Sequence, residues 1–451
     1  MKCLFLYFNT APNHIHYKNY SVKEEYRVRS QGSFIHNGIA YLSSIAKSLD
    51  FECMLFDISY VERSTLKQRF LETCLKFSPD ILAITCFTQN WNGIKDLLLN
   101  TFDCYPVGRP LIIIGGPHVS VAPESVISFP FIDIIAIGEG ETAFYQVLET
   151  LKKGGQFDAI PGIWFKDTNV IVKNSNPKLI KDLDDLPLPD WDVFDQSFLT
   201  SLNLDFKKKG VGIFNSSRGC LYHCTYCTSS HYQKLYESQK PYFREKSNER
   251  ILFEISEKRK KYEFSEIIFH DELFIKNTMR LKELAGKYQR EVGLPFIAQT
   301  TPESLSEETL SMIKDMGNKE LRIGIECGNE EFRRNVLKRR ISNQMLIDKF
   351  KLVKKYGIKI TTYNIIGFPF ETEEMIKETI ELNKILEPDQ TYVNIFQPLP
   401  GTPLFKLCLD NQLFKTEDHY DLRFGDDNSI IRTEVPNESL KYYKGMFINV
   451  L

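Results

Sequence analysis

Two blocks of the sequence alternate short apolar runs with segments of helical periodicity, and this alternation constrains the fold more than any other feature. In residues 1–150 the apolar runs are rich in Ile, Leu and Val, as in "ILAIT" at 81–85 and "LIIIGG" at 111–116. Helical patterns separate these runs, for example over residues 38–49 and 64–77. Continuous apolar strands alternating with helices are typical of a parallel sheet that is covered on both faces. The first block therefore predicts an α/β fold, a doubly wound, Rossmann-like domain with its ligand at the carboxyl ends of the strands.

The second block predicts a barrel. The alternation weakens over residues 151–205, which we interpret as a linker, and resumes over residues 206–408 with six further apolar runs. Six strands alternating with helices indicate a partial (β/α)6 barrel of the TIM type, whose chemistry lies at the carboxyl ends of its strands. Residues 409–451 carry no clear motif and are expected to form a C-terminal extension.

Charge and hydropathy exclude several function classes. The net charge of −2 over 451 residues gives no electrostatic reason to expect nucleic acid or an anionic membrane as a partner. No apolar stretch approaches the roughly 20 residues needed to span a bilayer, and the apolar N-terminal run is typical of a buried strand and lacks a signal-peptide cleavage pattern. We therefore expect a cytoplasmic protein, in which clustered cysteines bind metal and do not form disulfides.

Three cysteines lie close together in "SSRGCLYHCTYCTSS" at 216–230, at positions Cys220, Cys224 and Cys227. A structural zinc site takes four protein ligands, and His223 within the loop is the one candidate for a fourth. A 4Fe-4S cluster normally takes four thiolates, so three thiols leave one iron open to a ligand from outside the protein. The spacing favours this open cluster over zinc.

The spacing Cys-x3-Cys-x2-Cys, with an aromatic Tyr226 before the last cysteine, resembles the cluster loop of the radical S-adenosylmethionine (SAM) superfamily. In that family the amino and carboxylate groups of SAM chelate the open iron. Electron transfer from the cluster then cleaves SAM to a 5′-deoxyadenosyl radical. The resemblance implies that Tyr226 lies near the adenine and that an external donor such as flavodoxin or ferredoxin supplies the electron.

Later strand ends extend the resemblance. "HDE" at 270–272 takes the place of the family's Gly-Gly-Glu stretch, which implies that Asp271 or Glu272 holds the SAM amino group. Glu326 in "GIECGNE" resembles a ribose and carboxylate contact, and Gln299 ends a strand where ribose or substrate is expected. Gly367 in "IIGFP" resembles the turn that packs on adenine.

Cys327 is a further thiol at the predicted active face of the barrel. It could donate a hydrogen atom to a substrate radical. The alternative is that the tight turn in "GIECG" demands a small residue at this position.

Two glycine-rich turns in the first block resemble those of the cobalamin-binding radical SAM subfamily. "GGPHVSVAPE" at 115–124 and "IGEGET" at 137–142 both follow predicted strands. Glycines let the backbone approach a large planar cofactor, and the second turn offers amide donors to its polar side chains. The resemblance therefore implies cobalamin contacts from these turns, at Gly115, Gly116, Gly138, Glu139 and Gly140.

A histidine that ligates the cobalt from below is not expected. The turn at 57–62 reads "DISYVE", where cobalamin proteins with such a ligand carry Asp-x-His-x-x-Gly. The resemblance implies base-off cobalamin without histidine ligation. His118 is the nearest alternative ligand.

Together these features predict a cobalamin-dependent radical SAM enzyme, most simply a methyltransferase acting on an unactivated carbon of a small metabolite, natural-product intermediate or peptide. One SAM molecule supplies the methyl group to the corrin and a second supplies the radical, as the resemblance implies. One alternative keeps the radical chemistry without methyl transfer, as in an epimerase, a ring-forming enzyme or another oxidoreductase. The other is a non-catalytic iron-sulfur module used for binding or sensing.

Overall fold

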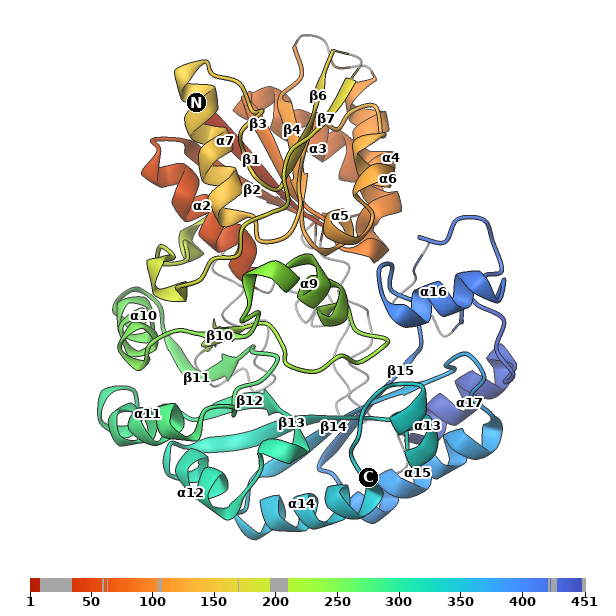
Figure 1. The fold of residues 1–451 in the computed structure, drawn as a ribbon. Coiled ribbons are helices and arrows are strands. Elements are labelled where there is room, and N and C mark those ends of the chain that lie inside the picture. Colours follow the sequence, from red (N-terminus) through yellow and green to blue (C-terminus); the bar gives the residue numbers. More distant parts are fainter. Residues whose placement is uncertain are drawn as a thin grey trace. The chain divides into compact units, whose positions relative to one another are not determined.

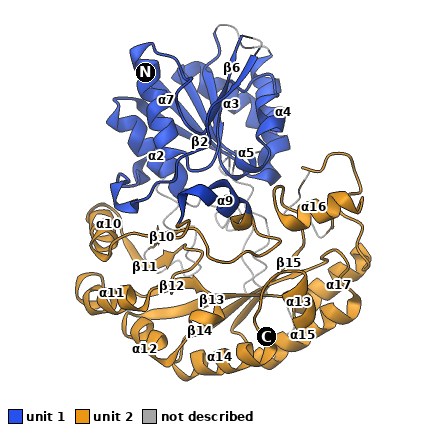
Figure 2. Cartoon of the chain, in the orientation of Figure 1, with its two compact units in different colours: residues 1–204, 231–240 blue, residues 205–230, 241–451 orange. Residues whose placement is uncertain are grey.

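The computed structural model describes residues 1–8, 35–194 and 210–447, apart from residues 59, 60, 63, 104, 106, 107, 169, 421 and 423–427. The chain forms two compact units, shown in different colours in Figure 2. Unit 1 contains residues 1–204 and 231–240, and unit 2 contains residues 205–230 and 241–451. Residues 231–240, called the inserted segment below, therefore belong to unit 1 although unit 2 precedes and follows them in sequence.

Unit 1 is built on a seven-stranded sheet of order β2-β1-β3-β4-β5-β6-β7. Its first five strands are parallel, and β6 and β7 add antiparallel at one edge. Figure 1 shows helices α2 and α7 against one face of the sheet and α3 and α4 against the other. The bounds are β1 Lys2–Tyr7, α2 Asn37–Ser48, β2 Glu52–Asp57, α3 Leu66–Phe77, β3 Ile81–Thr85, α4 Trp91–Phe102, β4 Leu111–Gly115, α5 Pro117–Val121, α6 Pro123–Ile127, β5 Ile134–Ala136, α7 Glu141–Lys153, β6 Ile163–Asp167 and β7 Val170–Lys173.

The doubly wound arrangement follows from the apolar strands. The central strands β3, β4 and β5 are buried on both faces, as a parallel sheet between two helix layers requires. The hairpin β6–β7 falls within the predicted linker. Its strands have only five and four residues and are partly exposed, so their pattern in the sequence is weak.

Unit 2 is a half-barrel of six parallel strands in the order β15-β14-β13-β12-β11-β8, and both predicted fold classes are thus confirmed. Helices α10, α11, α12, α14 and α15 follow its outer face (Figure 1). The bounds are β8 Gly210–Phe214, β9 Ser217–Arg218, α9 Ser229–Leu235, β10 Arg244–Glu245, α10 Asn248–Lys261, β11 Phe264–Phe269, α11 Thr278–Glu291, β12 Phe296–Thr300, α12 Glu307–Asp315, β13 Asn318–Glu326, α13 Glu330–Asn335, α14 Asn343–Lys355, β14 Lys359–Ile366, α15 Glu373–Leu386, β15 Gln390–Ile395, α16 Pro403–Asp410 and α17 Asn437–Phe447. Helix α9 begins in unit 2 and ends in the inserted segment of unit 1.

Helix α17 is part of the core of unit 2. Leu440 and Phe447 of α17 are buried in a cluster with Ile366 of β14, Ile380 of α15 and Ile395 of β15. The described part of the predicted extension therefore covers the last strands of the half-barrel. Among the described residues, no helix has the length and apolar character needed to cross a membrane.

Candidate functional site

The three clustered cysteines lie in unit 2, in the loop between β9 and α9. Cys224 is buried, and Cys220 and Cys227 are half-buried. Burial raises the pKa of all three thiols, that of Cys227 to about 12, and repulsion from neighbouring thiolates adds to the shift at Cys220 and Cys227. A metal centre would therefore have to displace the protons when it binds.

The donor set fits a cluster better than a single ion. Within the described part of the chain, no three His, Cys, Asp or Glu side chains converge as the ligands of one metal ion do. In a 4Fe-4S cluster each thiolate binds a different iron, so the sulfur atoms need not meet at a point. His223, the candidate fourth zinc ligand, is exposed.

Residues from several elements fix the loop. The Thr225 amide donates to the Leu337 carbonyl (3.2 Å), and the Thr225 hydroxyl donates to the Val336 carbonyl (2.7 Å). The Tyr222 hydroxyl lies 3.1 Å from that of Thr301, just after β12. These bonds hold the loop against the carboxyl ends of the barrel strands.

Arg339 provides a positive charge beside the loop. Its guanidinium donates to the Tyr226 hydroxyl (3.3 Å) and the Gly324 carbonyl (2.9 Å), and lies 3.7 Å from the Glu326 carboxylate. The Arg339 and Glu326 side chains are only 11% and 10% exposed. Burial raises the pKa of Glu326 and of Cys224, and in both cases the Arg339 charge opposes the shift. Arg339 therefore favours the anionic forms of both groups.

Glu326 lies at the end of β13 in a strained conformation. Its φ angle is 68°, in the left-handed region that residues with a Cβ rarely adopt. The register between β13 and β14 shifts between Gly324 and Glu326. A Cβ at Gly324 would lie 2.2 Å from the Glu326 carboxylate oxygen, so glycine leaves the space that this carboxylate occupies. Such outliers are typical of functional sites.

Asp271 and Glu272 differ in their surroundings. Asp271 is 2% exposed, and one carboxylate oxygen accepts the Ser216 amide (2.8 Å), the Ser217 amide (2.6 Å) and the Ser217 hydroxyl (2.9 Å). Burial raises the pKa of Asp271 to about 6. Glu272 is exposed, and its carboxylate accepts the Gly219 amide next to Cys220. Asp271 thus supports the chain that enters the loop, whereas Glu272 is accessible beside it.

Gly367 lies in a turn fixed by a buried carboxyl group. Its φ angle is 78°, and Glu371 accepts hydrogen bonds from the amides of Gly367 (2.5 Å) and Phe368 (3.1 Å). Burial raises the pKa of Glu371 to about 8. The Phe368 ring packs 6.0 Å from that of Tyr226, which joins this turn to the cluster loop. Gln299 is half-buried on β12, opposite Arg322 of β13.

Cys327 is fully buried. Its Sγ contacts Glu371 Oε1 (3.8 Å) and the Thr379 hydroxyl of α15 (3.9 Å). Burial raises the pKa of this thiol to about 12. The adjacent Gly328 leaves no room for a Cβ, which would lie 2.4 Å from the Thr379 backbone. This packing favours the role of a small residue in a tight turn over that of a hydrogen donor.

In unit 1 the first glycine turn follows β4. Gly116 has a φ angle of 104°, and a Cβ there would lie 2.9 Å from the Cys86 backbone, whereas Gly115 has ordinary space around it. His118 is fully buried, packs on Trp91 and lies 3.3 Å from the Thr88 hydroxyl. Its burial does not favour a role as a cobalt ligand. The turn at 57–62 includes residues 59 and 60, outside the described residues.

The second glycine turn, residues 137–141, has partners within unit 1. The Gly138 amide donates to the Ser120 hydroxyl (2.9 Å), and the Glu139 amide donates to the hydroxyl of Tyr236 (2.7 Å). Gly140 precedes the first residue of α7. Both turns lie at the carboxyl edge of the parallel sheet, where this fold binds ligands.

The sequence interpretation missed Arg339, Glu371 and Tyr236. Arg339 is part of "LKRR" at 337–340, which looks like an ordinary charged turn. Tyr236 gives no signal because its partner lies 97 residues away. Glu371 has a usable signal, since it follows Gly367 by four residues in a turn that was already singled out.

Each unit contains a segment that matches the profile of a known protein family. A profile of the radical SAM superfamily matches residues 214–382, and a profile of the B12 binding domain matches residues 26–148. An uncharacterized methyltransferase of Pyrococcus horikoshii is 30% identical over 84% of this chain and 79% of the relative. An anaerobic magnesium-protoporphyrin IX monomethyl ester cyclase of Cereibacter sphaeroides is 24% identical over 84% of this chain and 61% of the relative.

Among solved structures, the cobalamin-dependent S-adenosylmethionine radical enzyme OxsB has a similar fold. It aligns with a TM-score of 0.73 and 17% identity over 99% of this chain and 66% of that chain. These domains imply a 4Fe-4S cluster, SAM and cobalamin as cofactors. The chain therefore belongs to the cobalamin-dependent radical SAM superfamily, with a B12-binding domain ahead of a radical SAM domain.

Proposed function

We propose that the protein is a methyltransferase that transfers a methyl group to an unactivated carbon of a small metabolite, natural-product intermediate or peptide. The observation that carries the proposal is the combination, in one chain, of a three-thiol cluster loop with a B12-binding domain. The cluster supplies the electron that cleaves SAM, and the corrin supplies the methyl group. The name of the Pyrococcus relative supports methyl transfer.

The residues around the loop have separate roles in this proposal. Cys220, Cys224 and Cys227 bind the cluster, and the Arg339 charge offsets its negative charge. Glu272, exposed beside Cys220, accepts hydrogen bonds from the SAM amino group. Glu326 contacts the ribose and the Gly367 turn packs on the adenine. An external flavodoxin or ferredoxin supplies the electron.

In unit 1 the two glycine turns bind the corrin. His118, the histidine of the first turn, is buried. The substrate reaches the carboxyl ends of the barrel strands, where Gln299 is half-buried.

A second candidate function is radical chemistry without methyl transfer. The Cereibacter relative, similar over the same share of this chain, is named as a cyclase. The two functions differ in their SAM products. Methyl transfer yields S-adenosylhomocysteine as well as 5′-deoxyadenosine, whereas the alternative yields only 5′-deoxyadenosine and methionine.

The test is anaerobic reconstitution of the full chain with iron, sulfide and hydroxocobalamin. We expect about four irons and one corrin per chain after desalting. Incubation with a reductant and methyl-labelled SAM should then release S-adenosylhomocysteine and label the corrin. A variant with Cys220, Cys224 and Cys227 changed to Ala should retain no cluster, and Cys53→Ala, a half-buried thiol of unit 1, serves as the control.

Each readout can contradict the proposal. A full cluster without any retained corrin would exclude cobalamin-dependent methyl transfer. A retained corrin with 5′-deoxyadenosine but no S-adenosylhomocysteine would favour the alternative. If Cys53→Ala lost as much iron as the triple variant, the iron content would not support the assignment of the cluster to the loop.

A further inference from the structure

The inserted segment, residues 231–240, lies in an unexpected part of the fold. It begins four residues after Cys227 and lies inside the matched radical SAM profile, 214–382. The structure nevertheless packs it into unit 1, with the B12-binding domain. A stretch that belongs by sequence to the radical SAM domain thus completes the other domain.

Tyr236 makes the central contact of this segment. Its side chain is fully buried, and its hydroxyl accepts the Glu139 amide at 2.7 Å. Gly138 has a φ angle of 78°, and a Cβ at this position would lie 2.1 Å from the same hydroxyl oxygen. The position of the Tyr236 hydroxyl therefore leaves no space for a side chain at residue 138. Both this contact and the positive φ angle favour glycine there.

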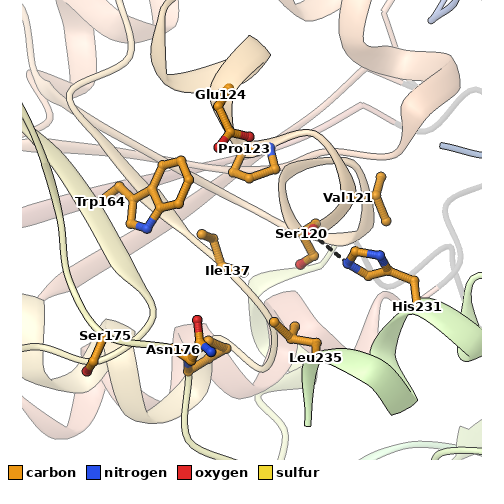
Figure 3. A pocket seen from close by; sticks show the side chains of 11 residues that line it. Ser120, Val121, Pro123, Glu124, Ile137, Trp164, Ser175, Asn176, His231 and Leu235 are labelled. Carbon is orange, nitrogen blue, oxygen red and sulfur yellow. Dashed lines mark hydrogen bonds between the residues drawn. The ribbon is translucent and has the colours of Figure 1, made fainter. Parts of the chain in front are cut away.

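A second set of bonds ties the inserted segment to the same turn. His231 Nε2 lies 3.0 Å from the Ser120 carbonyl, and the Ser120 hydroxyl accepts the Gly138 amide (2.9 Å). Figure 3 shows His231 directed at Ser120, with Leu235 on the same side of a pocket of about 340 Å³. Ser120 lies in α5, within the first glycine-rich stretch of residues 115–124, so this residue connects both turns to the segment.

The far end of the inserted segment is anchored as well. The side-chain oxygen of Gln239 accepts a hydrogen bond from the Leu179 backbone N–H, and its side-chain nitrogen donates one to the Pro177 carbonyl, both at 2.8 Å. Glu139 in turn accepts the Ile180 amide through its carboxylate (3.0 Å). The turn at 137–141 is thus held from two sides, by the inserted segment and by residues 177–180.

We propose that Tyr236 is a positioning residue for cobalamin binding, which fixes the turn of residues 137–141 at the corrin-binding edge of unit 1. The proposal rests on the proposed function, because it assumes that this turn contacts the corrin. Tyr236 acts through Gly138 and Glu139 and does not itself contact the cofactor. The radical SAM part of the sequence thereby contributes a residue to the cobalamin domain.

The experiment compares the full chain with its Tyr236→Phe variant. Hydrogen–deuterium exchange without cobalamin should be faster at 137–141 in the variant, because one amide loses its acceptor. Titration with hydroxocobalamin should then give a Kd about fivefold higher, as expected from the loss of one neutral hydrogen bond. Iron content and the spectral response of the cluster to SAM should equal those of the wild type.

Two further variants make the test specific. Gly138→Ala should raise the Kd as Tyr236→Phe does, and the double variant should show less than the sum of the two effects, because both act at one contact. Tyr145→Phe removes the hydroxyl of an exposed tyrosine of α7 that bonds Glu149, and should bind hydroxocobalamin like the wild type. A partly misfolded variant would instead lower the number of sites per chain without changing the Kd.

The outcomes separate this inference from the proposed function. Unchanged exchange at 137–141, or faster exchange with an unchanged Kd, would overturn the role of Tyr236. A wild type that binds no hydroxocobalamin would overturn the proposed function, while the exchange comparison would still show whether Tyr236 fixes the turn.

Discussion

The Arg339 guanidinium contacts both the cluster loop, at the Tyr226 hydroxyl, and the Glu326 carboxylate. Removing one member of a buried ion pair leaves the other charge uncompensated, which costs on the order of 3 kcal/mol. Arg339→Gln should therefore lower the free energy of unfolding by about that amount, measured by chemical denaturation. It should also shift the midpoint potential of the reconstituted cluster to more negative values, because the added electron loses a nearby positive charge.

The neighbouring Arg340 provides the control for this prediction. It is exposed, and Arg340→Gln removes the same charge from the same turn. We expect little change in the unfolding free energy or the potential of this variant. Equal effects of the two substitutions would mean that only the net charge of the turn matters.

Glu371 predicts a pH dependence of stability. Burial raises its pKa from 4.5 to about 8 in the folded protein. Between these two values the carboxyl group is protonated when folded and ionised when unfolded, so unfolding releases a proton and stability falls as the pH rises. Glu371→Gln keeps an acceptor for the Gly367 and Phe368 amides but cannot ionise. Its unfolding free energy should therefore fall less than that of the wild type from about pH 5 to pH 8.

The measurement is a series of thermal or denaturant unfolding curves at different pH values. Glu374→Gln, an exposed carboxylate in the first turn of α15, three residues after Glu371, is the matched control and should follow the wild type. A difference between Glu371→Gln and the wild type that does not vary with pH would assign Glu371 a packing role only.

At the scale of elements, β13 shows how a strand end creates a binding position. Gly324 leaves space for the Glu326 carboxylate, and an added Cβ would lie 2.2 Å from its oxygen. Gly324→Ala should displace that carboxylate and weaken SAM binding by about tenfold, as the loss of a hydrogen bond to a charged group implies. The spectral change of the cluster on SAM addition gives the affinity.

A glycine within a helix gives the contrasting result. Gly286 lies in α11, and a Cβ there would meet no atom within 4 Å. Gly286→Ala should raise the unfolding free energy by up to about 1 kcal/mol through helix propensity and leave SAM affinity unchanged. Weaker SAM binding in both variants would indicate a general loss of structure in unit 2.

The elements that could be predicted from the sequence are those whose pattern lies within a short stretch of residues. Strands such as β3 and β4 are continuous apolar runs, and helices such as α14 and α15 repeat apolar residues with helical spacing. Both patterns are contained in one short window. The hairpin β6–β7 was not predicted, because short, partly exposed edge strands lack such a pattern.

At the scale of the whole molecule, the sequence predicted both fold classes and the cysteine loop, because the loop spacing is itself a local signal. It could not predict which chain segments meet. Arg339 reaches the loop only because the segment after α13 folds back onto Tyr226 and Thr225. Tyr236 pairs with Glu139 of the first block, which no spacing reveals. The inserted segment lies in the second block of the sequence but packs within unit 1, which the alternation of strands and helices does not indicate.

The packing of the inserted segment within unit 1 predicts which residues hydroxocobalamin and SAM each protect from hydrogen–deuterium exchange. The inserted segment packs within unit 1, so hydroxocobalamin alone should slow hydrogen–deuterium exchange at 231–240 together with the two glycine turns of unit 1. SAM added to the cluster-loaded protein without cobalamin should slow exchange at 219–227, 270–272 and 324–327 of unit 2. Protection of the inserted segment by SAM alone, with the glycine turns unchanged, would contradict its assignment to unit 1. Protection at 231–240 by hydroxocobalamin in the wild type but not in Tyr236→Phe would support the role of the Tyr236 hydroxyl in linking the turn of residues 137–141 to the inserted segment.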